Sequence, residues 1–139
     1  MNLLKKIYQY KSLIPIAIWQ LSRAHWQIHH DKFKNLSHTL GDPNIDLSYQ
    51  PNEQALSCIK KTSTVIQKIG PYLKFRCFAQ AIAAQRLLKK QNIPTQLYLG
   101  VYKKELNMKA HAWLKCGDLF VTGKRGHENF TSVICYTSQ

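Results

Sequence analysis

The sequence has few acidic residues: seven Asp and Glu stand against 20 Lys and Arg, which gives a net charge of +13. A field of this sign attracts anions of any kind, including nucleic acid, membrane surfaces and acidic peptides. The basic residues are scattered along the chain, and no Gly-rich or aromatic-basic RNA motif accompanies them. The charge therefore indicates a class of partner, and no specific nucleic acid is expected.

The sequence also lacks a run of 18 apolar residues, which argues against a membrane-spanning helix. Its first residues place lysines before an apolar stretch, as a signal peptide does. However, Pro15 interrupts the stretch from Leu13 to Trp19, and no small-residue cleavage site follows. We therefore expect this segment to belong to the mature protein and the protein to be cytoplasmic.

No pair of cysteines has the CxxC spacing, and the four cysteines are widely separated: Cys58, Cys77, Cys116 and Cys135. No zinc signature accompanies His29, His30 and His38, so neither a metal nor another cofactor is expected. Disulfides are not expected in a protein that is not secreted. Four reduced thiols are then available, and most of them must be core residues.

The remaining composition is that of a folded protein, with 139 residues of which 45% are apolar. Residues 3–36 carry apolar and basic positions at helical spacing on both sides of Pro15, which predicts two helices or one kinked helix. A polar linker at 41–53 includes Asn52, which can cap a helix over 53–69 that stops at Gly70-Pro71.

The second half of the chain changes from helical to strand periodicity. A helix is expected from Cys77 to Gln91, before Ile93-Pro94. Four segments then alternate or carry strand-forming residues: 95–103, 109–116, 118–123 and 130–137. Helices followed by an antiparallel meander predict an α+β fold. We expect an N-terminal helical region and linker at 1–50 and a core at 51–139, together forming one compact domain.

Cys77 is the candidate nucleophile because it lies where the helix begins. Unpaired N–H groups and the positive end of the helix dipole stabilise a thiolate there, and Arg76 acts in the same direction. Four residues share its face of the helix: Gln80, Ala81, Ala84 and Leu88. The alanines would let the helix approach a sheet closely, and His111 on a strand could serve as the general base.

Most cysteines and histidines in such positions are packing residues, so neither Cys77 nor His111 alone indicates catalysis. The other thiols fit the role of nucleophile less well, because Cys58 lies within a helix while Cys116 and Cys135 lie in or beside strands.

The order of these elements resembles the transglutaminase-like leader peptidases of lasso-peptide biosynthesis, the microcin-processing family. The segments CFAQAIAAQRLLKKQNIPTQLYLGV and AHAWLKCGDLFVTG carry the resemblance, which covers about residues 75–131. The matching positions form an Ala-rich helix opened by cysteine, an Ile-Pro step, a Leu-x-x-Gly-Val strand and an Ala-His-Ala-Trp strand: Cys77, Ala79, Ala81, Ala83, Leu87, Leu88, Ile93, Pro94, Leu97, Gly100, Val101, Ala110, His111, Ala112 and Trp113.

The resemblance implies a papain-like cysteine peptidase, of the stand-alone form, that removes the leader from a ribosomally made precursor. Cys77 would attack the scissile carbonyl and His111 would carry the proton, oriented by an acidic residue on the next strand. The partners implied are the leader region of the precursor, a separate precursor-recognition protein and the lasso cyclase. Residues 1–50 fit this division of labour, because they contain no strand meander to which a leader could add as a strand.

The acid that the resemblance leads us to expect is absent. With a hairpin loop over Cys116-Gly117-Asp118, Lys115 faces Leu119 and His111 faces Gly123, where the acid should stand. Asp118 is the nearest acid, but at about 3.3 Å per strand residue it lies beyond hydrogen-bond reach of His111. A Cys-His dyad remains open beside three candidates for the third member: Asp118, Thr122 and Glu128.

Two residues are expected to support the site. Gln80 shares the Cys77 face and could donate to an oxyanion, although the Cys77 backbone N–H is the more direct donor because a helix start aims N–H groups at negative charge. Trp113 alternates onto the His111 side of its strand and is expected to shield the site.

Two other functions stay open. A non-catalytic basic adaptor could bind nucleic acid, an anionic membrane or an acidic peptide through its +13 charge, and peripheral membrane contact is compatible with either function. Amide transfer or amidase chemistry on the same two residues is also open.

Overall fold

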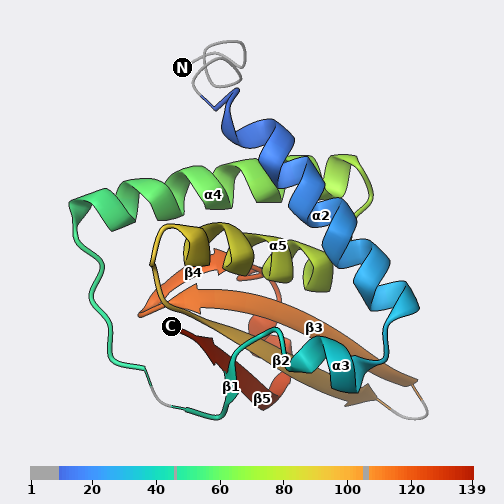
Figure 1. Ribbon diagram of the computed structural model, residues 1–139. Helices are drawn as coiled ribbons and strands as arrows, with labels where there is room; N and C mark the ends of the chain where they lie inside the picture. Colours follow the sequence, from blue (N-terminus) through green and yellow to red (C-terminus); the bar gives the residue numbers. More distant parts are fainter. Residues whose placement is uncertain (1–9, 46, 105–106) are drawn as a thin grey trace.

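The computed structural model describes residues 10–45, 47–104 and 107–139 of the chain (Figure 1). The helices are α2 (Leu13–His30), α3 (Phe33–Ser37), α4 (Glu53–Tyr72) and α5 (Cys77–Lys90), with a short 3-10 helix η1 (His127–Asn129). The strands are β1 (Asp42–Pro43), β2 (Thr95–Lys104), β3 (Asn107–Cys116), β4 (Leu119–Thr122) and β5 (Thr131–Ser138). The predicted α+β class is confirmed. The helical positions expected before residue 10 lie outside the described residues.

The boundaries of α4 follow the sequence at one end only. Asn52 caps the helix as predicted, because its side-chain oxygen accepts a hydrogen bond from the Ala55 N–H at 2.8 Å. The predicted stop at Gly70-Pro71 is wrong, since the helix continues to Tyr72. Pro71 lies in the last turn, and the N–H groups of Leu73 and Phe75 bond the carbonyls of Ile69 and Gly70 and so close the end of the helix.

All neighbouring strands of the five-stranded sheet are antiparallel, in the order β1-β5-β2-β3-β4. The predicted meander holds for β2, β3 and β4 but is wrong for the last strand, because β5 pairs with β2 on its other side. The chain turns after β4 at Gly123 and Gly126, both with positive φ, and passes through η1 before β5 begins. Local periodicity identifies the last strand but not its neighbour.

The register of the β3–β4 hairpin also differs from the prediction. The turn contains only Gly117-Asp118, and Cys116 pairs with Leu119. Gly117 has a φ of +58°, as a two-residue hairpin turn that begins with glycine requires. Lys115 therefore faces Phe120 instead of Leu119, and an irregularity before it pairs Leu114 with Thr122.

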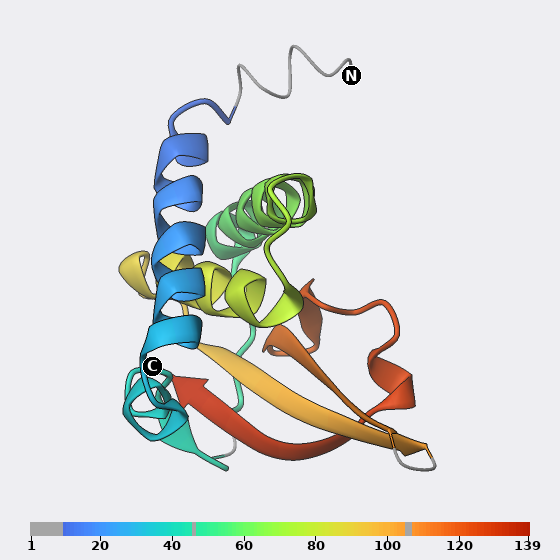
Figure 2. The same ribbon diagram turned by 90° about the vertical axis from the view of Figure 1, so that its right-hand side faces the viewer.

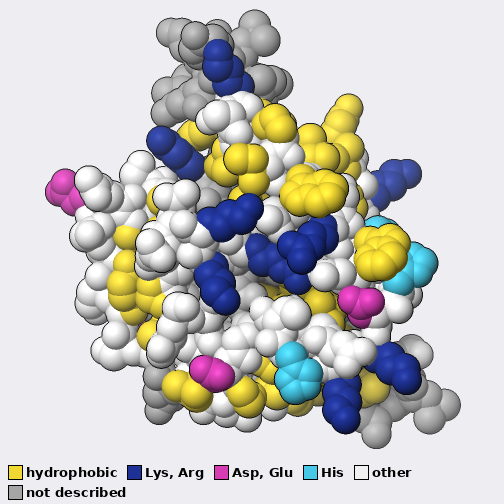
Figure 3. All heavy atoms as spheres, in the orientation of Figure 1, with side chains coloured by type: hydrophobic (Ala, Val, Ile, Leu, Met, Phe, Trp, Pro, Cys, Tyr) yellow, Lys and Arg dark blue, Asp and Glu magenta, His cyan; other side chains and the backbone are white. Residues whose placement is uncertain are grey.

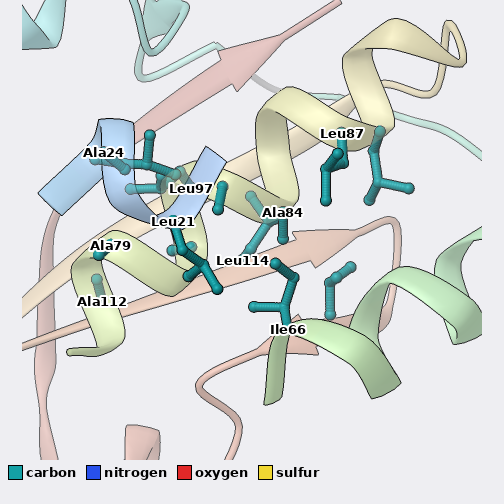
Figure 4. Close-up of a cluster of buried hydrophobic side chains, with 14 of the residues drawn as sticks. Leu21, Ala24, Ile66, Ala79, Ala84, Leu87, Leu97, Ala112 and Leu114 are labelled. Atoms are coloured by element: carbon teal, nitrogen blue, oxygen red, sulfur yellow. The ribbon is translucent and has the colours of Figure 1, made fainter. Parts of the chain in front are cut away.

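Helix α5 lies at the centre of the fold. Figure 2 shows α4 and α5 stacked over one face of the sheet, with α2 crossing them. Helix α5 packs against α2, α4, β2, β3 and β4. Eight of its residues are buried: Ala79, Ala81, Ile82, Ala83, Ala84, Gln85, Leu87 and Leu88. Figure 4 shows several of them among side chains from α2, α4 and the sheet. Because α2 packs directly on α5, the boundary expected near residue 50 does not separate two cores; its placement stays a prediction.

None of the helices in the described part of the chain is long and apolar enough to cross a membrane.

Replacing Ala84 by leucine should destabilise the fold by about 1–3 kcal/mol, because the site is fully buried and already filled. Urea unfolding measures the change. Lys89→Leu, on the exposed part of the same helix, is the matched control and should stay within about 0.5 kcal/mol of the parent. Equal stabilities of the two variants would contradict the close packing of α5.

Candidate active site

Cys77 is the first residue of α5, as predicted. Arg76 occupies the N-cap position and makes no side-chain capping hydrogen bond, so no side chain at that position occupies the N–H groups of the first turn. The thiol is partly buried and packs against the core. The local structure therefore offers a sulfur beside helix-start N–H groups, which is the arrangement that stabilises developing negative charge.

Gln80 supports the turn that leads into Cys77. Its side-chain Nε2 donates a hydrogen bond to the Phe75 carbonyl at 2.9 Å. The side chain packs on Gly70, where an added Cβ would lie 2.7 Å from Gln80 Cγ. The contact observed thus fixes the entry to α5, while a direct role of Gln80 as an oxyanion donor stays a prediction.

His111 lies on β3, on the face of the sheet away from the helices. Its neighbours Ala112 and Leu114 belong to the core that α5 covers, and successive strand residues alternate between faces. The His111 ring stacks on Trp113 at 5.8 Å between centroids, and Phe130 lies 5.1 Å from it. Trp113 in turn stacks on Tyr98, so the imidazole rests on an aromatic layer.

The His111 ring donates a hydrogen bond from Nε2 to the carbonyl oxygen of Gly123 at 2.8 Å. A carbonyl can only accept, so Nε2 must carry the proton in this contact. In the neutral ring the lone pair is then on Nδ1. The contact therefore selects the tautomer in which Nδ1 can accept a proton from a nucleophile.

The backbone at Gly123 explains why no acid stands there. Its φ is +75°, and an added Cβ would lie 2.5 Å from the Ala112 carbonyl oxygen and 2.8 Å from Trp113 Cβ. Aspartate cannot occupy this position without moving the strand. The main-chain carbonyl of Gly123 thus accepts the His111 hydrogen bond that a carboxylate was expected to accept.

None of the three candidates for a third member has a hydrogen bond to His111 among the described residues. Asp118 is exposed at the β3–β4 turn, and its neighbour Cys116 on β3 lies ~16 Å along the strand from His111. Thr122 is buried, and its hydroxyl has no partner in the described structure. Glu128 has a side chain that is 67% exposed and lies 3.2 Å from His127 Nδ1.

Sequence reasoning missed the role of His127 and Phe130. The His127 ring lies 4.5 Å from Phe120 and 5.8 Å from Trp113, and its side chain is only 30% exposed. Its Nδ1 donates to the Lys124 carbonyl at 2.6 Å. The aromatic residues at alternate strand positions were the available signal, but only the η1 turn brings these two rings to His111 and Trp113.

Cys77 and His111 lie at the same end of the layer formed by α5 and the sheet. From Lys90 back to Cys77 the helix is about 20 Å long, and β2 covers about the same distance between Thr95 and Val101. Gly100, just before Val101, pairs with His111. Ala79, near the start of α5, and Ala112, next to His111, belong to the same core cluster (Figure 4). No hydrogen bond joins the thiol to His111 in the described structure, so their pairing stays a prediction.

Cys116 is excluded as a nucleophile by its surroundings. Its side chain is fully buried, and the thiol donates a hydrogen bond to the Pro94 carbonyl at 3.3 Å. Burial raises the pKa of Cys116 to about 11, so it stays protonated at neutral pH. The described residues also hold no group of three or more His, Cys, Asp or Glu side chains arranged to bind a metal ion.

Residues 33–135, which make up most of the chain, match the transglutaminase-like superfamily. The chain belongs to the transglutaminase-like superfamily. Domains of this superfamily are typically cysteine-protease-like, and the match includes both Cys77 and His111. No curated protein and no solved structure shows significant similarity to this transglutaminase-like chain.

Gly123→Ala should disturb the His111 contact, because the added methyl group is strained by the positive φ and collides with the Ala112 carbonyl. Gly126→Ala is a matched control: Gly126 has a φ of +84° but no atom within 4 Å of an added Cβ. Both should lose about 1–2 kcal/mol from backbone strain. Only Gly123→Ala should change the ¹⁵N shifts of the His111 ring, measured by NMR. Identical spectra of the two variants would contradict this role of Gly123.

Proposed function

We propose that the protein is a cysteine peptidase that removes the leader from a ribosomally synthesised lasso-peptide precursor. The observation that carries the proposal is the His111 Nε2–Gly123 hydrogen bond, because it leaves Nδ1 as the base at the end of the sheet where α5 begins with Cys77. Membership of the transglutaminase-like superfamily supports the peptidase chemistry. The sequence resemblance supports the leader as substrate.

In the proposed mechanism, Nδ1 of His111 takes the Cys77 proton and the sulfur attacks the scissile carbonyl carbon. The N–H groups at the start of α5 stabilise the oxyanion. The imidazolium then returns its proton to the leaving amine, and a water molecule hydrolyses the thioester and releases Cys77. Because His111 is on the far face of β3, the two residues would meet around the strand edge that its ring approaches at Gly123.

A carbonyl at the third position changes the electrostatics of the site. It fixes the tautomer as a carboxylate would, but it contributes a dipole and no full negative charge to the imidazolium. The site would therefore hold its base in the correct orientation while stabilising the charged intermediate less. Slow turnover is compatible with an enzyme that cuts each precursor only once.

We further propose that a separate protein captures the leader, in the cytoplasm, and that the product passes to a lasso cyclase. The described part of residues 10–50 supports this division, since it contains two helices and only the two-residue strand β1. If the purified chain bound leader peptide as tightly as a mixture with that protein, this part of the proposal would be wrong.

A non-catalytic basic adaptor remains the second candidate, because the positive side chains have few counterions. Seven Asp and Glu stand against 20 Lys and Arg, and Glu128 lies 3.2 Å from His127 Nδ1, which is an ion pair only when that imidazole is protonated. Burial, with a further contribution from the nearby Arg23, lowers the pKa of Arg86. Figure 3 shows Lys and Arg side chains gathered in the middle of one face and few acidic ones beside them. If the protein is an adaptor, the Cys77→Ala substitution should leave its binding to anions unchanged.

Cys77→Ala should abolish cleavage, and His111→Ala should lower its rate by about 10²–10⁴-fold through loss of the base. Asp118→Ala should stay within about twofold, because Asp118 is remote from His111. Mass spectrometry of a candidate precursor, incubated with the protein and its partner, measures all three. Full activity of Cys77→Ala would reject the peptidase and favour the adaptor.

Iodoacetamide at pH 7 should label Cys77 before Cys58, Cys116 or Cys135, as read by peptide mapping. Cys116 should react only near pH 11 or after unfolding, because burial raises its pKa to about 11 and thiolates are the reactive form. His111→Ala should slow labelling of Cys77 and leave Cys58 unchanged. Equal labelling of all four thiols in the folded protein would return Cys77 to the role of a packing residue.

A further inference from the structure

Strand β3 has a free edge beside the candidate site. β4 pairs only with the last residues of β3, from Leu114 to Cys116. On that side, no strand in the described part of the chain pairs with β3 from Asn107 to Trp113. A strand edge of this length presents unpaired N–H and C=O groups to another chain.

The carbonyl of Ala112 shows which residues of β3 point their backbone N–H and C=O groups away from β2. Its oxygen points to the β4 side, because an added Cβ on Gly123 would lie 2.5 Å from it. In an antiparallel ladder the backbone groups of successive residues point alternately to one neighbour and to the other. Ala110 and Met108 therefore aim their N–H and C=O groups outward, while Lys109 and His111 aim theirs at β2.

Among the described residues no strand covers this edge, and it includes His111. Met108 is 72% exposed, and Lys109 and Ala110 are exposed as well. The Gly123 carbonyl accepts the hydrogen bond from His111 Nε2, and at this residue, which has a φ of +75°, the chain turns away from β3. On the β4 side, no described strand therefore lies next to β3 beside the candidate base His111.

We infer that the outward edge of β3 at Met108 and Ala110 binds the substrate as an added, extended strand, through main-chain hydrogen bonds. The inference rests on the proposed function and specifies how that site would hold a peptide. Pairing by the main chain leads an unfolded peptide along β3 toward His111 with few demands on its sequence.

The charge of the molecule favours a peptide over a second copy as the occupant. Two chains of +13 each repel, and pairing of two β3 edges would bring Lys109 of one copy near Lys109 of the other. An extended leader with acidic residues would meet attraction at the same place.

Met108→Pro tests the edge, because it removes one outward N–H that β2 does not use. Met108→Ala is the matched control, since it removes the same side chain and keeps the N–H. Both are made in the Cys77→Ala background, checked for folding by urea unfolding, and titrated with acetylated decapeptides selected for binding from a randomised library. Met108→Pro should weaken binding by about fivefold, the loss of one hydrogen bond, and Met108→Ala by less than about twofold.

A second measurement does not depend on the proline variant folding. N-methylation along a selected decapeptide should weaken binding at every second residue, because only alternate N–H groups of an added strand face β3. The amides of Met108 and Ala110 should also exchange more slowly with solvent when the peptide is bound. Equal affinities of the proline and alanine variants, N-methyl effects without a two-residue period, or a dimer broken by Met108→Pro would each overturn the inference.

Cleavage of a candidate precursor separates this inference from the peptidase proposal. A precursor that binds the edge but is not cut by the unmodified protein together with its partner would refute the peptidase and leave the edge site in place. For cleavage, the two Met108 variants are made with Cys77 intact. A precursor that is cut at equal rates by Met108→Pro and Met108→Ala would refute the edge site and leave the peptidase in place.

Discussion

The close approach of α5 to the sheet is the constraint on which the rest of the structure depends. Buried alanines, among them Ala81 and Ala84, leave room for the sheet on one side and for α2 and α4 on the other. A helix that is packed against the sheet on one side and against other helices on the other is fixed in position as well as in direction. That position sets where α5 starts, and so brings the Cys77 thiol and its free N–H groups to the end of the sheet that carries His111.

The opposite half of the candidate site is organised by main chain as much as by side chains. The Gly123 carbonyl fixes the His111 tautomer, and the same residue takes the chain away from β3. Both tasks need a backbone that approaches Ala112 more closely than any side chain permits. The missing aspartate is therefore explained by geometry: the strand that would have carried it ends at Thr122, one residue earlier.

Short-range sequence signals correctly predicted the features of the fold that local interactions determine. The Asn52 cap, the start of α5 at Cys77 and all four long strand segments follow from short-range sequence signals. The end of α4, the two-residue hairpin turn and the pairing of β5 with β2 depend on partners distant in sequence, and these predictions failed. Trp113 was expected on the His111 side of the strand, but Phe130 beside His111 and the Gly123 contact were not foreseen. A backbone carbonyl has no residue type to mark it.

The core around α5 draws on both ends of the described chain. Leu21 of α2 and Tyr136 of β5 belong to the same buried cluster as the alanines of α5. During synthesis the helix therefore leaves the ribosome before the strand that completes its surroundings exists. The core around Cys77 is therefore complete only after Tyr136 has emerged from the ribosome.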